Sequence, residues 1–260
     1  MNVKILNLDL FATYKEIVGQ SPKAILETVQ KIETPVEYFR FYNSVSSVYS
    51  SKIEGEPIDF DSFFKHKFMN VRYQPDYTKK ADDLYQAYEF IFKNKLSFGN
   101  LQKAHAILSA NLLPPSQQGL IRTNPMFVIN SNDRIEYVAA EPIKVKPALD
   151  KLFRDILLLQ QADLDEFQIF YFASYIHLVF VKIHPFQDGN GRAARLLEKW
   201  FLIEQLGEKA TAVQLEKNYY TNLEQYYSNI KALGLEYETL DYSKALNFLL
   251  MTVRGLHIQK

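Results

Sequence analysis

The chain has 260 residues, of which 47% are hydrophobic and 23% charged, a composition typical of a globular protein with a sizeable core. Its 30 Lys and Arg residues balance 30 Asp and Glu residues, and this zero net charge argues against a broad nucleic-acid-binding surface. It has no cysteine, which excludes disulfides, thiolate metal sites and cysteine nucleophiles. The N-terminus lacks a signal-peptide pattern, and the longest apolar stretch, 170–183, is too short and polar to span a membrane. We therefore expect a cytoplasmic protein without membrane or nucleic-acid partners.

Helical periodicity dominates the first half of the sequence. We expect helices over residues 9–31, 37–52, 77–94 and 98–112. The pair Ser21-Pro22 divides the first of these in two, because proline is tolerated at the start of a helix but not in its interior. Gly55 and Pro57 end the second.

The pattern changes at residues 126–139. Two short runs rich in β-branched and aromatic residues flank an Asn- and Asp-containing turn at 130–133, which predicts a β-hairpin. Helical patterns resume over 146–159, 163–183 and 192–206, followed by about three more helices, the last over 242–256. The sequence thus predicts a mainly α protein with one hairpin insertion.

The most distinctive segment is the loop at 184–192. Pro185 ends the preceding helix. Gly189, Asn190 and Gly191 then present sparsely shielded backbone N–H groups at the start of the next helix. Such a helix N-terminus is suited to binding phosphate.

Charged side chains complete this candidate site. Arg192 and Arg195 are three residues apart, so both can face one side of a helix and bind phosphate oxygens. Asp188 supplies a carboxylate of the kind that Mg²⁺ uses together with substrate phosphates. His184 is suited to removing a hydroxyl proton. Each residue alone has an ordinary structural alternative, but their coincidence predicts phosphoryl or nucleotidyl transfer.

Residues 184–195, which read HPFQDGNGRAAR, match every fixed position of the Fic signature H-x-F-x-(D/E)-G-N-G-R-x-x-R. The chain therefore resembles the Fic family. The resemblance implies the Fic fold, a helical core with a β-hairpin flap over the active site. It also implies transfer of AMP from ATP to a Ser, Thr or Tyr hydroxyl of a target protein, with release of pyrophosphate.

The resemblance also assigns roles to the residues of the signature. His184 would be the general base, Phe186 would fix the loop to the core and Asp188 would hold Mg²⁺. The ATP phosphates would lie against Asp188, Gly189, Asn190, Gly191, Arg192 and Arg195, with Arg195 on the γ-phosphate. The intact Gly-Asn-Gly-Arg segment favours AMP transfer over the phosphate transfer of Doc-type relatives.

In this scheme the chain divides into three parts. Residues 1–97 would form an N-terminal helical region with an inhibitory helix at about 37–55. Residues 98–206 would form the Fic core, with the flap at about 126–139. Residues 207–260 would pack as C-terminal helices. The target protein would lie along the flap hairpin by strand addition, although a plain hairpin covering the core is the alternative.

A second motif lies far upstream of the signature. Residues 50–55, SSKIEG, resemble the inhibitory motif (S/T)-x-x-x-E-(G/N) of Fic proteins, with Ser50, Glu54 and Gly55 at its fixed positions. Ser50 and Glu54 share a helix face. Glu54 could form a bidentate pair with Arg195 and keep it from the γ-phosphate. The alternative is a solvated carboxylate at a helix end.

Other residues are ambiguous. Tyr219 and Tyr220 follow the signature helix at the distance where the family places residues near the nucleotide, but aromatic core contacts explain them slightly better. His177 is best explained as a hydrogen-bonded core histidine. Within enzymes, AMP removal from a modified protein uses the same residues. A non-catalytic nucleotide-binding module is the other alternative. Self-modification and homo-oligomer formation through the inhibitory helix are further expectations from the family.

Overall fold

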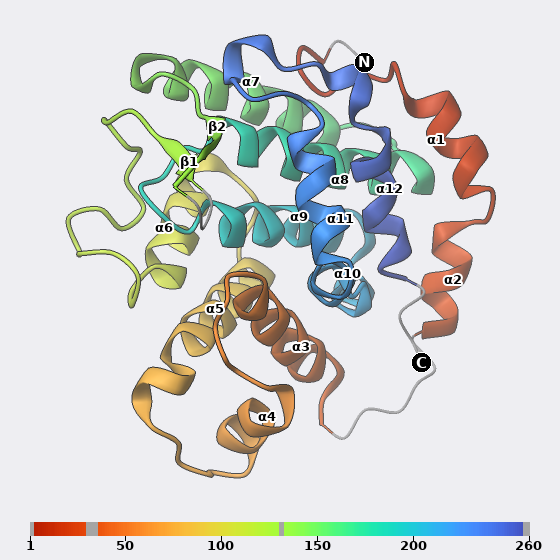
Figure 1. Cartoon of the computed structure of the whole chain (residues 1–260). Coiled ribbons are helices and arrows are strands. Elements are labelled where there is room, and N and C mark those ends of the chain that lie inside the picture. The colour runs from red at the N-terminus through yellow and green to blue at the C-terminus, as the bar shows by residue number, and fades with distance from the viewer. Residues whose placement is uncertain (1–2, 30–35, 130–132, 257–260) are drawn as a thin grey trace.

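Helix α8 (Glu166–Ile183) lies at the centre of the structure, a computed structural model that describes residues 3–29, 36–129 and 133–256 (Figure 1). Fourteen of its 18 residues are buried. A capping box between Asp165 and Gln168 begins the helix. The helix ends at His184, whose φ of 54° is left-handed. Proline at position 185 disfavours helical angles at His184, so sequence and geometry agree on this boundary.

The other helices surround α8. Helix α9 (Asn190–Leu206), α12 (Leu246–Arg254) and α7 (Pro142–Gln160) pack directly against it. The remaining helices are α1 (Phe11–Val18), α2 (Pro22–Val29), α3 (Tyr38–Ile53), α4 (Phe60–Phe68), α5 (Pro75–Lys93), α6 (Phe98–Leu108), α10 (Leu215–Thr221) and α11 (Leu223–Lys231). Short 3₁₀ turns occupy Glu208–Ala212, Tyr237–Thr239 and Tyr242–Lys244. Among the described helices, none combines the length and apolar character needed to cross a bilayer.

The two strands form one antiparallel hairpin. Strands β1 (Phe127–Ile129) and β2 (Ile135–Val138) pair with Phe127 opposite Val138. The backbone N–H of Val138 also donates to the carbonyl of Leu235 at 2.8 Å, which ties β2 to the segment after α11. The predicted turn lies largely outside the described residues. The prediction of a mainly α fold with one hairpin is confirmed.

Several predicted boundaries were wrong. Helix α7 begins at Pro142 rather than at 146, because proline fits the first helical position. Helix α4 was not predicted; Asp59 begins it by accepting the N–H of Ser62. Helix α9 begins at Asn190, two residues earlier than expected. The expected break at Ser21-Pro22 is present, between α1 and α2.

Helix α3 brings the upstream motif to the signature. It packs against α5 and α10 and touches α9 (Figure 1). A small separate cluster of Val48, Ile58, Phe63, Ala81 and Tyr85 joins α3 to α4 and α5. The C-terminal end of α3 therefore lies beside the N-terminal end of α9. The predicted division of the chain at 97 and 206 stays a prediction.

The N-terminal segment is fastened to α7 by one carboxylate. Asp155 is fully buried. Its oxygens accept the backbone N–H groups of Lys4, Ile5 and Leu6 at 2.6–3.0 Å. Hydrogen bonds from several amides compensate the buried charge, so residues 4–6 have a fixed place against α7.

Candidate active site

The signature loop is held in shape by two side chains. Asn190 accepts the N–H of Phe186 and donates to its carbonyl, both at 2.8 Å. The ring of Phe186 is fully buried and stacks on His105, with centroids 3.6 Å apart. His105 donates from Nε2 to the carbonyl of Asp188 and accepts the N–H of Gly119 at Nδ1. His105 had not been singled out from the sequence, and it positions the loop.

Two glycines allow close approaches in this loop. Gly189 has a left-handed φ of 74° at the start of α9. A side chain at Gly191 would place its Cβ 2.7 Å from Oε1 of Glu54 and 3.2 Å from a nitrogen of Arg195. Glycine at 191 therefore leaves the space in which these two charged groups meet, at the N-terminus of a helix.

One ring nitrogen of His184 has no hydrogen-bond partner among the described residues. Its Nδ1 donates to the carbonyl of Val181 at 3.1 Å, which leaves Nε2 as the proton acceptor. Burial lowers the pKa of His184 to about 4, and the nearby Arg122 guanidinium adds to this effect. The imidazole is therefore neutral at physiological pH and competent as a base.

Arg122 ties the base of the flap to the loop. It is 4% exposed. Its guanidinium donates to the carbonyls of His184, Asn124 and Ala140 at 2.6–2.7 Å. The backbone N–H of Arg122 donates to the carbonyl of Pro185. Sequence reasoning gave this residue no role, because its partners lie up to 62 positions away.

The upstream motif meets the signature at Arg195. Its Nη2 donates to Oε1 of Glu54 at 2.6 Å, and its Nε and Nη2 donate to the hydroxyl and carbonyl of Ser50. Arg195 is 1% exposed, whereas the Glu54 side chain is 29% exposed. Burial acts to raise the pKa of Glu54, but Arg195 and Arg192 outweigh it and lower that pKa. The carboxylate is therefore ionised. A single nitrogen–oxygen contact joins the pair, not the expected bidentate one. Gly55, the last motif residue, has a left-handed φ of 83° just beyond the helix.

A second acid engages the other signature arginine. Glu56 accepts from Nη2 of Arg192 at 3.2 Å and from Lys80 at 2.6 Å. Arg192 is 4% exposed, and its Nε has no hydrogen-bond partner among the described residues. Arg192 is thus buried, and at least one of its N–H donors has no partner among the described residues. The sequence signal was an acid two positions after Glu54, which had been overlooked.

A buried chain of hydrogen bonds supports Arg195 from behind. Nη1 of Arg195 lies 3.4 Å from the hydroxyl of Tyr226, which lies 3.0 Å from Nε2 of His177. Nδ1 of His177 lies 2.6 Å from Glu198. Burial lowers the pKa of His177, so the neutral ring donates to Glu198 and accepts from Tyr226. His177 is thus a hydrogen-bonded core histidine, as expected from the sequence. Tyr219 also donates to Glu198.

The predicted nucleotide tyrosines lie elsewhere. Tyr219 is buried against Glu198, and the ring of Tyr220 packs near Tyr49 and Lys52. Neither lines the cavity of about 220 Å³ beside His184. This cavity lies between the flap and α11, and its lining includes Glu54, Tyr137, Arg195, Tyr226, Tyr227 and Ile230. The pair Glu136–Lys231, at 2.7 Å, joins the flap to α11 beside it.

Asp188 offers one carboxylate to a magnesium site that substrate would complete. One carboxylate oxygen of Asp188 accepts a hydrogen bond from the N–H of Gly189. Within residues 3–29, 36–129 and 133–256, no three His, Asp or Glu side chains gather as a ready-made metal site. One carboxylate is nevertheless enough where phosphate oxygens and water supply the other ligands.

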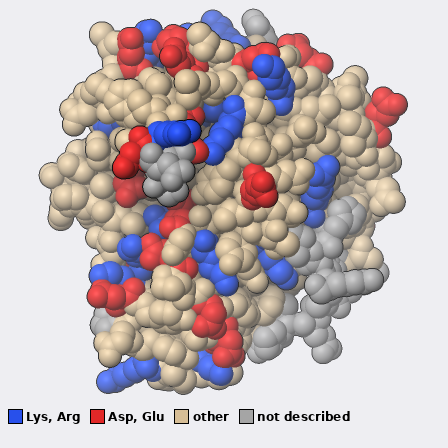
Figure 2. Space-filling view, viewed as in Figure 1, with Lys and Arg blue, Asp and Glu red and all other residues tan. Residues whose placement is uncertain are grey.

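Figure 2 shows acidic and basic side chains intermingled on the surface of this view, in keeping with the zero net charge.

A sequence profile of the Fic/DOC family matches residues 95–202. The chain carries a Fic domain. A search of curated protein sequences returned no match. Similar solved structures include a Fic family protein from Desulfovibrio desulfuricans G20, with a TM-score of 0.69 at 20% identity over 98% of this chain and 73% of that one. A Fic domain containing signaling protein from Bacteroides thetaiotaomicron has a TM-score of 0.66 at 18% identity, over 92% and 94%.

Fic-1 from C. elegans is a third similar structure, with a TM-score of 0.62 at 16% identity over 95% of this chain and 72% of that one. At such low identities these likenesses establish the fold. Fic domains are generally linked to protein AMPylation or to transfer of other nucleoside monophosphates.

The depressed pKa of His184 gives a pH prediction. Because its folded pKa of about 4 lies below the ~6.5 of an unperturbed histidine, the unfolded chain binds more protons as pH falls. Stability from this group is complete above pH ~6.5 and declines as pH falls toward the folded value. We expect the His184 imidazole resonance, assigned with His184→Ala, to stay at its neutral position from pH 7 to about 5.5. A titration midpoint near 6.5 would contradict the account.

The chain behind Arg195 gives a stability prediction. Tyr226→Phe removes a buried hydroxyl and leaves groups on both His177 and Arg195 unsatisfied, which costs about 1–3 kcal/mol. Tyr227→Phe is the matched control, since its hydroxyl makes one bond of 3.3 Å and the residue is 38% exposed. Urea denaturation measures both variants. Equal midpoints for the two would show that the Tyr226 hydroxyl contributes no special support.

Proposed function

We propose that the protein transfers AMP from ATP to a hydroxyl of a protein substrate, with release of pyrophosphate, and that Glu54 holds this activity off. The observation that carries the proposal is the meeting of three groups in one cavity. The free Nε2 of His184, the guanidinium of Arg195 and the N-terminus of α9 border the same space. They supply a base and a phosphate cradle, the two components that nucleotidyl transfer requires.

In the proposed reaction, the target hydroxyl loses its proton to Nε2 of His184 as its oxygen bonds to the α-phosphorus. The bond from this phosphorus to the bridging oxygen of the β-phosphate breaks, and pyrophosphate leaves. Backbone N–H groups at Gly189–Gly191 and the Arg192 guanidinium stabilise the phosphate charge. Asp188 would hold Mg²⁺, which neutralises phosphate charge when bound.

Inhibition follows from the competition for Arg195. A guanidinium that donates to Glu54 and Ser50 has little capacity left for a γ-phosphate. ATP would then bind with its α-phosphate displaced from the line of attack. A displacement of about 1 Å costs roughly a hundredfold in rate, or about 2.7 kcal/mol of barrier.

Glu54→Gly should raise self-modification or target modification by about a hundredfold, because it frees Arg195 for the γ-phosphate. Intact mass spectrometry after incubation with ATP and Mg²⁺ measures the gain of AMP. The matched control is the double variant Glu54→Gly/His184→Ala, which should bind ATP and gain no mass.

Equal low transfer by wild type and a folded, ATP-binding Glu54→Gly variant would refute the inhibition. Transfer that persists without His184 would refute the base. Addition of phosphate rather than AMP would identify a kinase-type reaction.

We expect Glu56 to inhibit as well, more weakly than Glu54, through its ion pair with Arg192. In the Glu54→Gly background, Glu56→Gln should tighten ATP binding several-fold, because the carboxylate no longer competes with phosphate for the guanidinium. Lys80→Gln is the matched control and should act in the opposite direction, since Lys80 shares the Glu56 oxygen with Arg192. Isothermal titration calorimetry measures both. Unchanged ATP affinity in both variants would show that Glu56 does not compete.

A further inference from the structure

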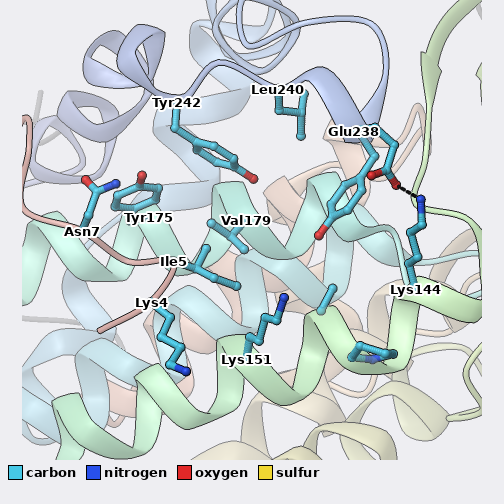
Figure 3. Close-up of a pocket in the computed structure, with 13 residues that line it drawn as sticks. Lys4, Ile5, Asn7, Lys144, Lys151, Tyr175, Val179, Glu238, Leu240 and Tyr242 are labelled. Carbon is cyan, nitrogen blue, oxygen red and sulfur yellow. Dashed lines mark ion pairs between the residues drawn. The ribbon is translucent and has the colours of Figure 1, made fainter. Parts of the chain in front are cut away.

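A second cleft lies apart from the active site (Figure 3). The N-terminal segment, α7, α8 and residues 237–242 enclose about 770 Å³, within the range of small-molecule sites. The cleft shares no lining residue with the cavity beside His184. Nothing in the proposed AMP transfer uses it.

The floor of this cleft is apolar and aromatic. Ile5, Ala148 and Val179 supply aliphatic surface, of which Ala148 and Val179 are buried. The rings of Tyr175 and Tyr242 lie 5.8 Å apart at an angle of 41°. The Tyr175 ring is covered within the core, so a flat apolar body would meet the partly exposed surfaces of Tyr242, Ile5 and Leu240.

The polar groups of the cleft are mostly donors. Lys4, Lys144 and Lys151 line it, against one carboxylate, Glu238. Lys144 bonds to Glu238 at 3.0 Å, so the acid is already neutralised. The side-chain ends of Lys4 and Lys151 have no ion-pair partner within the part of the chain that the structure describes.

Two of these donors aim into the space from opposite sides. Figure 3 shows the Lys151 ammonium rising from α7 and the Tyr242 ring descending from the C-terminal segment. Burial raises the pKa of Tyr242, so its hydroxyl is protonated and can donate. No described residue forms a hydrogen bond with this hydroxyl.

The walls are built in advance. Asp155 holds the backbone of residues 4–6 against α7, which fixes Ile5 and the start of the Lys4 side chain at the edge. Tyr175 is 1% exposed and belongs to the main core. A preformed site of this kind loses little freedom on binding.

We propose that this cleft binds a small organic anion with a flat aromatic body. The anionic group would lie between Lys151, Lys4 and the hydroxyl of Tyr242. The aromatic body would lie on the partly exposed surfaces of Tyr242, Ile5 and Leu240. An anionic group would gain charge-assisted hydrogen bonds from the two ammonium groups, which an uncharged aromatic would not gain, and a bare inorganic anion would leave the apolar surface uncovered.

The site adjoins the support of the flap. Residues 237–242 continue directly from Leu235, whose carbonyl accepts the N–H of Val138 in β2. Gly234 accepts from Lys182 at 3.4 Å, and Lys182 lines the cavity beside His184. A ligand against Tyr242 therefore contacts a segment that also holds β2, so the Val138 amide is a nearby reporter of binding.

The test measures the binding of the probe 2-naphthoate to the full chain. Amide NMR and calorimetry, both without ATP, follow the binding. We expect saturable binding of one probe per chain, with shifts at Val138 and around Tyr175. Lys151→Gln should weaken it about tenfold, the size of one charge-assisted contact. Tyr242→Phe should weaken it less. Lys146→Gln, on α7 but outside the cleft, should leave it unchanged.

The neutral analogue 2-naphthamide and inorganic phosphate should each bind at least tenfold more weakly than 2-naphthoate. No saturable binding at millimolar probe would overturn the proposal. Equal affinity in Lys151→Gln and Lys146→Gln would overturn it, as would shifts confined to residues around His184. Since the readout needs neither ATP nor catalysis, failure of AMP transfer would leave this result unaffected.

Discussion

The buried guanidinium of Arg195 is the group on which the arrangement of this protein depends. A charge that is 1% exposed must be compensated within the protein. Ser50 and Glu54 compensate it from α3, and Tyr226 supports it from α11. In the proposed function, the same arginine would also bind a phosphate of the nucleotide. Helices α3, α9 and α11 therefore share one electrostatic requirement, which a nucleotide phosphate can also satisfy.

That requirement connects stability with activity. In the absence of nucleotide, Glu54 satisfies Arg195 and the helix α3 end is held in place. In the proposed function, a phosphate would compensate the guanidinium from the other side, and the two anions would compete for one site. The partly exposed position of Glu54 suits such an exchange, because water can solvate the carboxylate once it has left the arginine. The fully buried Glu198 chain behind Arg195 has no such freedom and keeps the guanidinium in position.

The sequence predicted where the signature loop lies, because Pro185 ends α8 and eight fixed positions among twelve adjacent residues match the family signature. It also predicted the meeting of Glu54 with Arg195, but only through family resemblance, since 141 positions separate them. Local patterns could not predict contacts made in three dimensions between distant segments. The residues missed for this reason are His105, Arg122, Glu56 and Tyr226. Predictions of helix boundaries were wrong where a capping residue, as at Asp59, or an early proline, as at Pro142, sets the start of the helix.

The most direct test of the account is the position of the ATP γ-phosphate in crystals of the wild type and of Glu54→Gly, both grown with ATP and Mg²⁺. The account predicts that in the variant a γ-phosphate oxygen lies within hydrogen-bond distance of Arg195, with the α-phosphorus open to attack from the His184 side. In the wild type, Glu54 should keep Arg195 and the phosphates should be displaced. Identical phosphate positions in both crystals, with the Glu54–Arg195 pair intact in the wild type, would contradict it.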